Sequence, residues 1–156
     1  MFNIVLFEPC IPQNTGNIIR LCANSGARLH LIHPMKFHWD DRQLRRSGLD
    51  YHEFASVQHY DNWEHFQELM GQRRIWALTT RGQRSVFSAR FNPNDVLLFG
   101  SESSGLSPAI HSQLDQAQKL RLPMQCHSRS LNLANAVAVV LYEALRQNIN
   151  AEKLTL

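Results

Sequence analysis

Three polar stretches of the chain carry side chains that could bind a ligand or take part in a reaction. They are Asn14–Arg20 (NTGNIIR), Gly100–Leu106 (GSESSGL) and Ser128–Asn135 (SRSLNLAN). Each lies next to an apolar run, and a packed apolar element can hold such groups rigidly from behind. In the second stretch, the carboxylate of Glu102 favours a cationic or hydroxyl-bearing ligand over a phosphate.

The glycine-rich second stretch follows Val96–Phe99, an apolar run that predicts a strand. In open α/β sheets ligands bind beyond the carboxyl ends of the strands, so this is a favourable place for a site. Gly100 and Gly105 have the spacing of a phosphate-binding P-loop, but Leu106 stands where that motif needs Lys. The serines do not form the G-x-S-x-G of a hydrolase elbow. A nucleotide hydrolase is therefore disfavoured, and a purely structural glycine turn stays open.

The third stretch opens the most apolar segment of the chain, Ser128–Ala144. Its apolar residues recur at helical spacing, which predicts a helix buried on most sides. Ser130 or Asn132 could cap the start of this helix, because their side-chain oxygens accept a backbone N–H. An ordinary capped core helix and a ligand site supported by that helix both fit this pattern.

Length and composition indicate a single globular domain, residues 1–156. The net charge of +3 and the pI of about 9.0 are compatible with nucleic-acid binding without requiring it. Three cysteines without a C-x-x-C pair indicate a reducing compartment, and the scattered histidines predict no metal site. The opening MFNIVLF is typical of a strand rather than a signal peptide. No apolar run approaches the roughly 18 residues of a membrane span, so we expect a cytoplasmic protein.

Short apolar runs alternate with helical patterns along the chain. This alternation predicts an α/β fold with a mostly parallel sheet and helices on both faces. The expected strands are Phe2–Phe7, Arg28–Ile32, His52–Val57, Ile75–Thr79, Val96–Phe99 and Lys119–Leu122. The expected helices are Ile18–Asn24, Asp40–Arg46, Asp61–Met70, Ser107–Leu114 and Leu131–Arg146, with loops over Glu8–Thr15 and Arg81–Arg90.

The three polar stretches together resemble the motifs of the SPOUT (SpoU-like) RNA 2′-O-methyltransferases. The segments that carry this resemblance are Asn14–Asn24, Leu97–Leu106 and Ser128–Val139. A further likeness to the subfamily that modifies the wobble nucleotide, position 34, of tRNA runs over Glu8–Asn24, Trp39–Phe54 and Ala77–Gly82. The resemblance extends over roughly residues 1–148 and rests on three ordered motifs.

The resemblance implies a deep trefoil knot in the C-terminal part of the chain, a homodimer, and S-adenosylmethionine as the cofactor bound at the knot. The residues that would hold the cofactor are Leu78, Thr79, Gly100, Glu102, Leu122, Met124, Ser130 and Asn135. The helix Leu131–Arg146 is apolar around most of its circumference, so we expect it to form much of the dimer interface. A charge at Val140 or Leu141 would then unfold the subunit or release monomers.

The resemblance also implies catalytic roles. Arg20 occupies the position of the family's catalytic arginine, and Asn14, Glu102, Asn132 and Tyr142 complete the polar set. The reaction would transfer a methyl group from a sulfonium to a ribose 2′-hydroxyl, which must be positioned and must lose its proton. Because a guanidinium stays protonated in proteins, Arg20 would stabilise the developing alkoxide or bind a phosphate. Water or an RNA phosphate would then accept the proton.

The catalytic domain itself would have to bind RNA, since the pattern indicates no separate RNA-binding domain. The resemblance implies the anticodon stem-loop of tRNA-Leu isoacceptors as substrate. Ser103 and Ser104 stand where relatives often carry Thr-Arg, which removes one possible phosphate contact. A non-catalytic RNA-binding or ribosome-assembly protein on the same fold is the alternative. The candidate RNA-binding residues are Arg81, Arg129 and a group on one helix face, Arg42, Arg45 and Arg46, which would fit a solvated face equally well.

Overall fold

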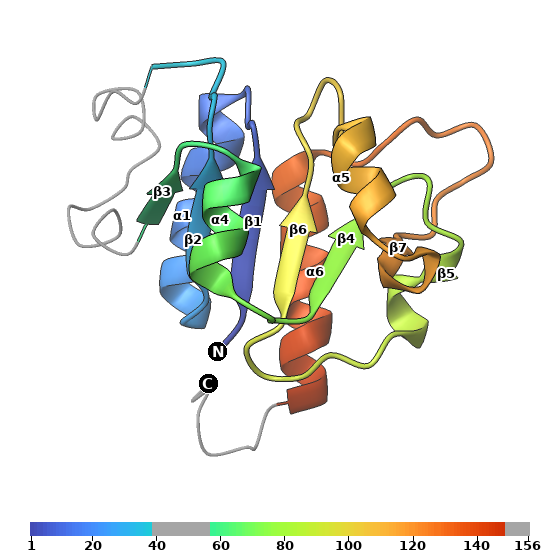
Figure 1. Ribbon diagram of the computed structural model, residues 1–156. Coiled ribbons are helices and arrows are strands. Elements are labelled where there is room, and N and C mark those ends of the chain that lie inside the picture. Colours follow the sequence, from blue (N-terminus) through green and yellow to red (C-terminus); the bar gives the residue numbers. More distant parts are fainter. Residues whose placement is uncertain (39–56, 149–156) are drawn as a thin grey trace.

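The computed structural model describes residues 1–38 and 57–148, and within them seven strands form one sheet (Figure 1). The strands are β1 (Asn3–Phe7), β2 (Arg28–Ile32), β3 (Val57–Tyr60), β4 (Ile75–Leu78), β5 (Arg84–Ser85), β6 (Val96–Phe99) and β7 (Lys119–Arg121). The helices are α1 (Pro12–Ser25), α4 (Trp63–Met70), α5 (Pro108–Gln113) and α6 (Leu133–Asn148), with 3₁₀ turns η1 (Val86–Ser88) and η2 (Gln116–Gln118). The strand order is β3-β2-β1-β6-β4-β7-β5, and each neighbouring pair is parallel. Helices α1 and α6 cover one face and α4 and α5 the other, which confirms the predicted fold class.

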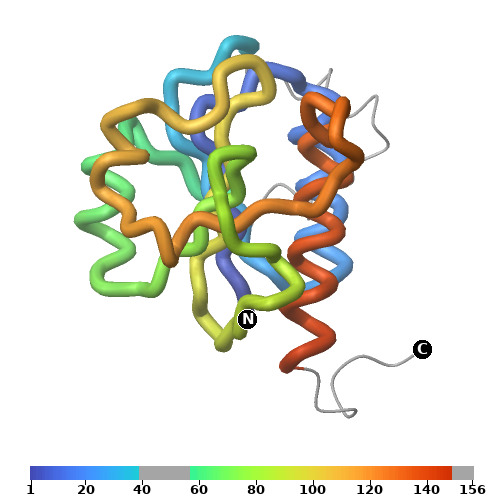
Figure 2. The backbone as a smooth tube through the Cα atoms, turned by 90° about the vertical axis from the view of Figure 1, so that its right-hand side faces the viewer, coloured from blue at the N-terminus to red at the C-terminus, as the bar shows by residue number. Residues whose placement is uncertain are grey.

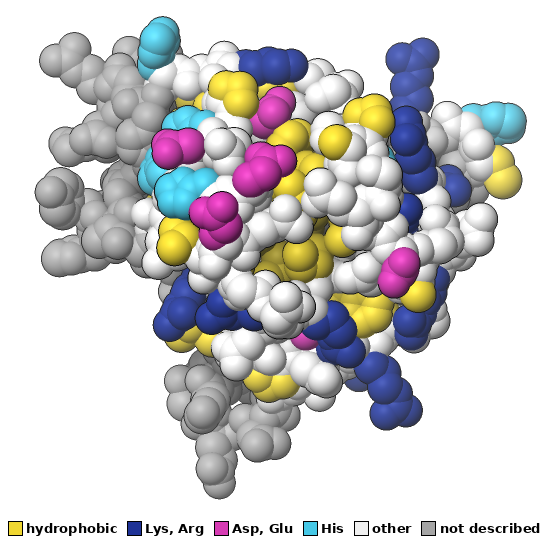
Figure 3. All heavy atoms as spheres, viewed as in Figure 1, with side chains coloured by type: hydrophobic (Ala, Val, Ile, Leu, Met, Phe, Trp, Pro, Cys, Tyr) yellow, Lys and Arg dark blue, Asp and Glu magenta, His cyan; other side chains and the backbone are white. Residues whose placement is uncertain are grey.

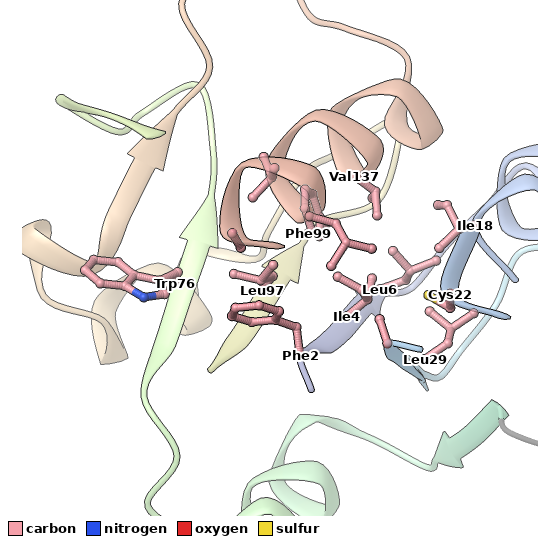
Figure 4. Packing of buried hydrophobic residues seen from close by; sticks show 14 of the residues in the cluster. Phe2, Ile4, Leu6, Ile18, Cys22, Leu29, Trp76, Leu97, Phe99 and Val137 are labelled. Atoms are coloured by element: carbon pink, nitrogen blue, oxygen red, sulfur yellow. The ribbon is translucent and has the colours of Figure 1, made fainter. Parts of the chain in front are cut away.

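Alternate side chains of the central strands fill two apolar layers, one on each face of the sheet. Ile4 and Leu6 of β1 share a cluster with Val137 of α6 (Figure 4). Val5 points to the opposite face, into the cluster formed with α4 and α5. Because side chains alternate along a strand, a strand buried on both faces has to be apolar at nearly every position. The two layers hold the carboxyl ends of the strands, and the loops that follow them, in fixed positions.

Helix α1 begins earlier than the sequence predicted. The turn-forming residues Asn14–Asn17 indicated a loop through Thr15, but the helix starts at Pro12. Proline suits the first helical turn because it lacks an N–H that would have no acceptor there. Residues 14–16 therefore lie buried in the first turns of the helix rather than in a loop. The prediction of a loop was wrong from Pro12 onward.

Helix α6 uses one of its two predicted caps, since the Asn132 side-chain oxygen accepts a backbone N–H of the first turn at 3.2 Å. Val140 and Leu141 are fully buried within the protein's own core. A charge at these positions was expected either to unfold the subunit or to release monomers. Because both side chains are buried, a charge there would have no water or partner, and we expect unfolding. The exposed apolar residues of α6 are instead Val139 and Tyr142, which are 41% and 53% exposed.

One predicted helix and most of one predicted strand lie outside the described residues, and one predicted loop contains regular structure. The helix Asp40–Arg46, with Arg42, Arg45 and Arg46, lies outside the described residues, as does all but the last residue of the strand His52–Val57. The described strand, β3, begins at Val57 and continues to Tyr60. The predicted loop Arg81–Arg90 contains β5 and η1, and the Ser85 hydroxyl caps η1 by accepting the Phe87 N–H at 3.2 Å.

Strand β7 enters the sheet between β4 and β5, which are themselves separated by only a short connection, residues 79–83. The N–H of Thr79 donates to the carbonyl of Leu120 at 2.9 Å. A Cβ at Gly82 would lie 2.6 Å from the carbonyl carbon of Leu120, so the connection passes directly against β7. Figure 2 shows the tube of residues 119–132 crossing that of residues 79–90. The close approach of the two backbones requires glycine at position 82.

Candidate active site

A cavity of about 500 Å³ opens beyond the carboxyl ends of β4, β6 and β7. Its lining comes from residues within 78–80 after β4, 99–106 after β6 and 121–133 after β7, together with Ile11 and Asn14 at the start of α1 and Ala136 of α6. Parallel strands end at the same edge of a sheet, so three loops distant in sequence meet there. All three polar stretches singled out in the sequence contribute to this one cavity.

A chain of hydrogen bonds joins the three stretches. The side-chain amide of Asn132 donates to the Asn14 side-chain oxygen at 2.9 Å. The Asn14 amide in turn donates to Oε1 of Glu102 at 3.0 Å. Asn14 is buried and Glu102 half-buried, so each hydrogen bond is shielded in part from water. These contacts fix the orientation of three polar side chains at the wall of the cavity.

Glu102 also accepts two backbone N–H groups just before α1, from Cys10 at 2.8 Å and from Ile11 at 3.2 Å. Partial burial raises the pKa of Glu102, but the hydrogen bonds from Asn14 and from the backbone N–H of Cys10 outweigh it and leave the pKa lowered. Hydrogen bonds to the charged form of a carboxyl group have this effect. Glu102 is therefore ionised at neutral pH and ties the loop after β6 to the start of α1.

The ionised Glu102 should make the stability of the protein depend on pH. Its pKa is lowered in the folded state, so its contribution is present above the unfolded pKa, about 4.3, and is lost as the pH falls through the folded pKa. We expect Glu102→Gln to lower the urea midpoint by a constant amount above about pH 5, and by progressively less on acidification. Urea titrations from pH 3 to 7 measure this difference. The exposed carboxylate variant Glu68→Gln is the control, and a Glu102→Gln deficit that stays constant down to pH 3 would contradict the expectation.

The loop after β6 is folded tightly on itself. The N–H of Ser101 donates to the Gly105 carbonyl at 3.1 Å, and the N–H of Gly105 donates back to the Ser101 carbonyl at 2.8 Å. A Cβ at Gly100 would lie 2.2 Å from the Gly105 carbonyl carbon, and Gly105 itself has a φ of +69°. Both glycines are therefore required by the backbone. The two glycines therefore have a structural role in this turn. The same tight turn also forms part of the wall of the cavity.

Residues 1–142 of the chain match the SpoU rRNA Methylase family. The chain belongs to this family. The resemblance indicated by the three motifs is thus confirmed, and the cavity described above is formed by those motifs.

Curated relatives that are very similar in sequence match this chain over almost their whole length. A tRNA (cytidine(34)-2′-O)-methyltransferase of Yersinia pestis is 55% identical over 152 residues, which cover 94% of each chain. The enzyme of the same name from Escherichia coli K12 is 54% identical over 147 residues, again 94% of each chain. A structure solved for insight into 2′-OH methylation of C/U34 on tRNA superposes with a TM-score of 0.88 at 42% identity, over 95% of this chain and 96% of that one. The SpoU methyltransferase AviRb of Streptomyces viridochromogenes, solved with AdoMet, superposes with a TM-score of 0.81 at 26% identity, over 95% of this chain and 58% of that one.

Most of the residues expected to hold a cofactor line the cavity beyond β4, β6 and β7. Asn135 is the exception, since it lies exposed in the first turn of α6 and outside the lining. Arg129, expected to contact RNA, also lines the cavity. The expected cofactor residues that line it are Leu78, Thr79, Gly100, Glu102, Leu122, Met124 and Ser130.

Two expected catalytic residues lie outside this cavity within one chain. Arg20 is exposed on α1, more than one turn beyond Asn14, and Tyr142 is exposed on α6. Helices α1 and α6, which carry these two residues, pack against each other on one face of the sheet. A single subunit thus brings Asn14, Glu102 and Asn132 together at the cavity, whereas Arg20 and Tyr142 are not among the residues that line it.

Basic side chains gather along one edge of the sheet. Arg81, Arg84 and Arg121 are exposed on or beside β5 and β7, and Arg129 follows on the segment that lines the cavity. Figure 3 shows Lys and Arg side chains along this side of the molecule. Of the RNA-binding candidates, Arg81 and Arg129 therefore lie near the cavity, and the others lie outside the described residues.

One basic residue near the cavity carried no signal in the sequence. Lys36, in the segment after β2, donates its ammonium to the hydroxyl of Ser103 at 3.4 Å. Its backbone N–H donates to the Pro9 carbonyl at 3.2 Å, which places this segment beside the start of α1. A lone lysine 67 positions away from its partner has no recognisable pattern, so only the folded chain reveals this cation beside Ser103.

Within the described residues, no helix is long and apolar enough to span a membrane. In the same part of the chain, no three His, Cys, Asp or Glu side chains come together as ligands of a metal ion would. The three cysteines are free: Cys22 is buried, Cys10 is half-buried and Cys126 is exposed.

Proposed function

We propose that this protein is an S-adenosylmethionine-dependent tRNA methyltransferase that modifies the 2′-hydroxyl of nucleotide 34. The observation that carries the proposal is the hydrogen-bonded chain Asn132–Asn14–Glu102 at the wall of a cavity built from all three SpoU motifs. Both relatives named above, each more than half identical to this chain, bear the name of this activity. The substrates are tRNA-Leu isoacceptors in the cytoplasm, as the resemblance implies.

The cavity fits the cofactor in size and chemistry. A volume of about 500 Å³ lies within the range typical of small-molecule sites. Leu78, Leu122 and Met124 supply apolar walls, while Thr79 and Ser130 supply polar groups for a base or a ribose. The ionised carboxylate of Glu102 suits a cationic ligand. When bound, S-adenosylmethionine supplies an electrophilic methyl group on a sulfonium.

The protein's own residues orient the acceptor and stabilise its charge. Asn14 and Asn132, held in place by Glu102, can fix the ribose hydroxyl in line with the donor, and positioning of this kind accounts for much of the rate in such transfers. The guanidinium of Arg20 stabilises the alkoxide that develops as the proton leaves. Water or an RNA phosphate accepts that proton.

The exposed positions of Arg20 and Tyr142 support a homodimer whose active sites are completed across the interface. Exposed apolar residues on and just before α1 and α6 include Ile11, Leu131 and Val139. An apolar face of this kind on a small domain is typically covered by a partner. A two-fold interface through α1 and α6 would bring Arg20 of each subunit toward the cavity of the other.

The passage of β7 supports the proposed knot. The segment after α5 enters the sheet between β4 and β5, against the connection that links those two strands. The chain then continues through the cavity wall into α6. A C-terminal segment threaded past residues 79–90 in this way is the arrangement that a trefoil knot requires.

The assay that tests the function is methyl transfer to defined tRNA. We expect the protein to label tRNA-Leu with S-adenosylmethionine at the ribose of nucleotide 34 and nowhere else, because an anticodon loop presents this nucleotide unpaired. Mass spectrometry of nuclease fragments locates the methyl group. A transcript with a 2′-deoxy nucleotide at position 34 is the matched control and should take up no label.

Three results would reject the assignment. Label on a base atom would exclude 2′-O transfer, and label on another nucleotide would exclude position 34. Tight tRNA binding without turnover would favour the alternative, a non-catalytic RNA-binding protein on the same fold.

A further inference from the structure

A second cavity, of about 530 Å³, lies on the α4 face of the sheet, between β1, β2, β3 and the C-terminal end of α4. None of the described residues that line it also lines the active-site cavity. Its lining includes the first residues of β1 and β2, Asn3 and Arg28, whereas the active site lies beyond the carboxyl ends of strands. Nothing in the methyl-transfer reaction makes use of it.

Strand register gives this second cavity a polar floor. Asn3 of β1 is directly opposite Arg28 of β2, and His30 of β2 is opposite Gln58 of β3. Opposite residues share a face of the sheet, and successive residues of a strand alternate between faces. The intervening Leu29 packs into the core under α1 and α6, so the four polar residues all face α4.

The floor is ordered by hydrogen bonds around a buried histidine. His30 is 1% exposed, and its Nδ1 lies 2.8 Å from the Tyr60 hydroxyl. Its Nε2 lies 3.3 Å from the side-chain oxygen of Asn3. The Tyr60 hydroxyl donates to Oε1 of Gln58 at 2.9 Å. Burial, together with the charges of Arg28 and Arg73, lowers the pKa of His30 to about 4, so its ring is neutral at neutral pH.

Two exposed guanidinium groups stand at the rim of this floor. Arg28 and Arg73 both line the cavity, and both charges act on the same buried His30. Among the described residues, neither forms an ion pair with a carboxylate, whereas Arg74 pairs with Asp95 at 2.6 Å. Figure 3 shows Lys and Arg side chains gathered on this face below α4. Two like charges over a neutral polar floor create a positive potential that an anion would neutralise.

The remaining wall is apolar. Leu69 and Met70 of α4 line the cavity, and Leu69 is 64% exposed. This apolar wall and the pair of guanidinium groups complement two parts of a nucleotide, its flat base and its phosphate. A simple inorganic anion would leave the apolar wall unused.

We propose that this second cavity binds a nucleotide phosphate, with Arg28 and Arg73 on the phosphate and Leu69 and Met70 against the base. The nucleotide is either free or part of an RNA chain. This inference goes beyond the methyl-transfer function and does not depend on it.

The test uses two probes, AMP and an unmodified tRNA, on the full-length protein saturated with S-adenosylhomocysteine. The variant Arg28→Gln/Arg73→Gln removes both charges, and Arg28→Lys/Arg73→Lys keeps them. Arg90→Gln removes an exposed arginine that lines neither cavity. Thermal melting of each variant verifies folding, and the single variant Arg28→Gln replaces the double variant if that one melts early.

For a free nucleotide, we expect calorimetry to show AMP binding that weakens at least tenfold in the Gln pair and is retained in the Lys pair and in Arg90→Gln. If the cavity instead binds a nucleotide that is part of an RNA chain, AMP should not bind. The slope of log K for tRNA against log salt should then become shallower by about 1.4 in the Gln pair alone, which is the value for two lost single-strand phosphate contacts. If the Gln pair matches wild type with both probes, the proposal is overturned. Loss of methylation alone bears only on the proposed function.

Discussion

We expect the replacement of Arg20 with alanine to lower the turnover of tRNA methylation by about a hundred- to a thousandfold, because a group that stabilises a developing anion is removed. The affinity for S-adenosylmethionine should change by less than about twofold, because the proposed role of Arg20 is toward the acceptor hydroxyl and not toward the cofactor. Single-turnover kinetics at saturating tRNA measure the first quantity, and calorimetry measures the second.

Two further variants make the Arg20 experiment specific. Arg20→Lys keeps the charge but not the planar guanidinium, so it should recover only part of the lost activity. Arg90→Ala removes an exposed arginine away from the cavity and should leave turnover unchanged. If Arg20→Ala turns over at the wild-type rate, or loses cofactor affinity in proportion to its rate, the proposed role of Arg20 fails.

We expect a charge at Val139 to release folded monomers that methylate at least a hundredfold more slowly. Val139 is a partly exposed apolar residue of α6, so aspartate there can remain hydrated in a monomer but not inside an interface. Light scattering and turnover on the same sample give the two readouts. Phe87→Asp changes a more exposed apolar residue, on η1 rather than on α6, and should stay dimeric and active.

The neighbouring residue, Val140, serves as the buried control for Val139. Val140 is fully buried in the subunit core, so Val140→Asp should unfold the chain rather than dissociate it. Circular dichroism separates these outcomes. A fully active Val139→Asp monomer at working concentration would refute the proposed dimer.

Heterodimers test whether the active site is shared between subunits. One subunit carries Arg20→Ala, and its partner, with a different affinity tag, carries Glu102→Ala. If Arg20 acts in the cavity of its partner, each heterodimer has one site with both residues intact and about half of the wild-type activity, as two-fold symmetry requires. If Arg20 acts within its own subunit, both sites lack one residue and the heterodimer is as inactive as either parent.

The amino-acid sequence determined the class of fold and the family. The apolar runs around Val96–Phe99 and Arg28–Ile32 alternate with helical patterns, and the strands and helices lie there. The loop motif Gly100–Leu106 was identifiable because both of its glycines are required by the local backbone, independently of anything distant. A backbone conformation that only certain residues can adopt restricts the residue type at that position, so such positions can be recognised from the sequence.

Where a residue type suits two local structures, the sequence was ambiguous. The start of α1 is the clearest case: Pro12 and the turn-forming Asn14–Asn17 both indicated a loop, yet the helix begins at Pro12. Proline suits the first turn of a helix, and the earlier start buries Asn14, Thr15 and Gly16 on the same helix as Ile18 and Ile19. Propensity is weak beside the burial of an apolar face.

The tertiary structure alone decided which polar groups meet. Asn132 and Asn14 are 118 positions apart and hydrogen-bonded, and Lys36 contacts Ser103 across 67 positions. The insertion of β7 between β4 and β5 and the facing of His30 and Arg28 toward α4 are likewise matters of strand order and register. Periodicity tells which side of a strand or helix is buried, but not which strand becomes its neighbour, because pairing is determined by the packing of the whole chain. For the same reason the apolar circumference of α6 did not distinguish Val140, in the core, from Val139 at the surface.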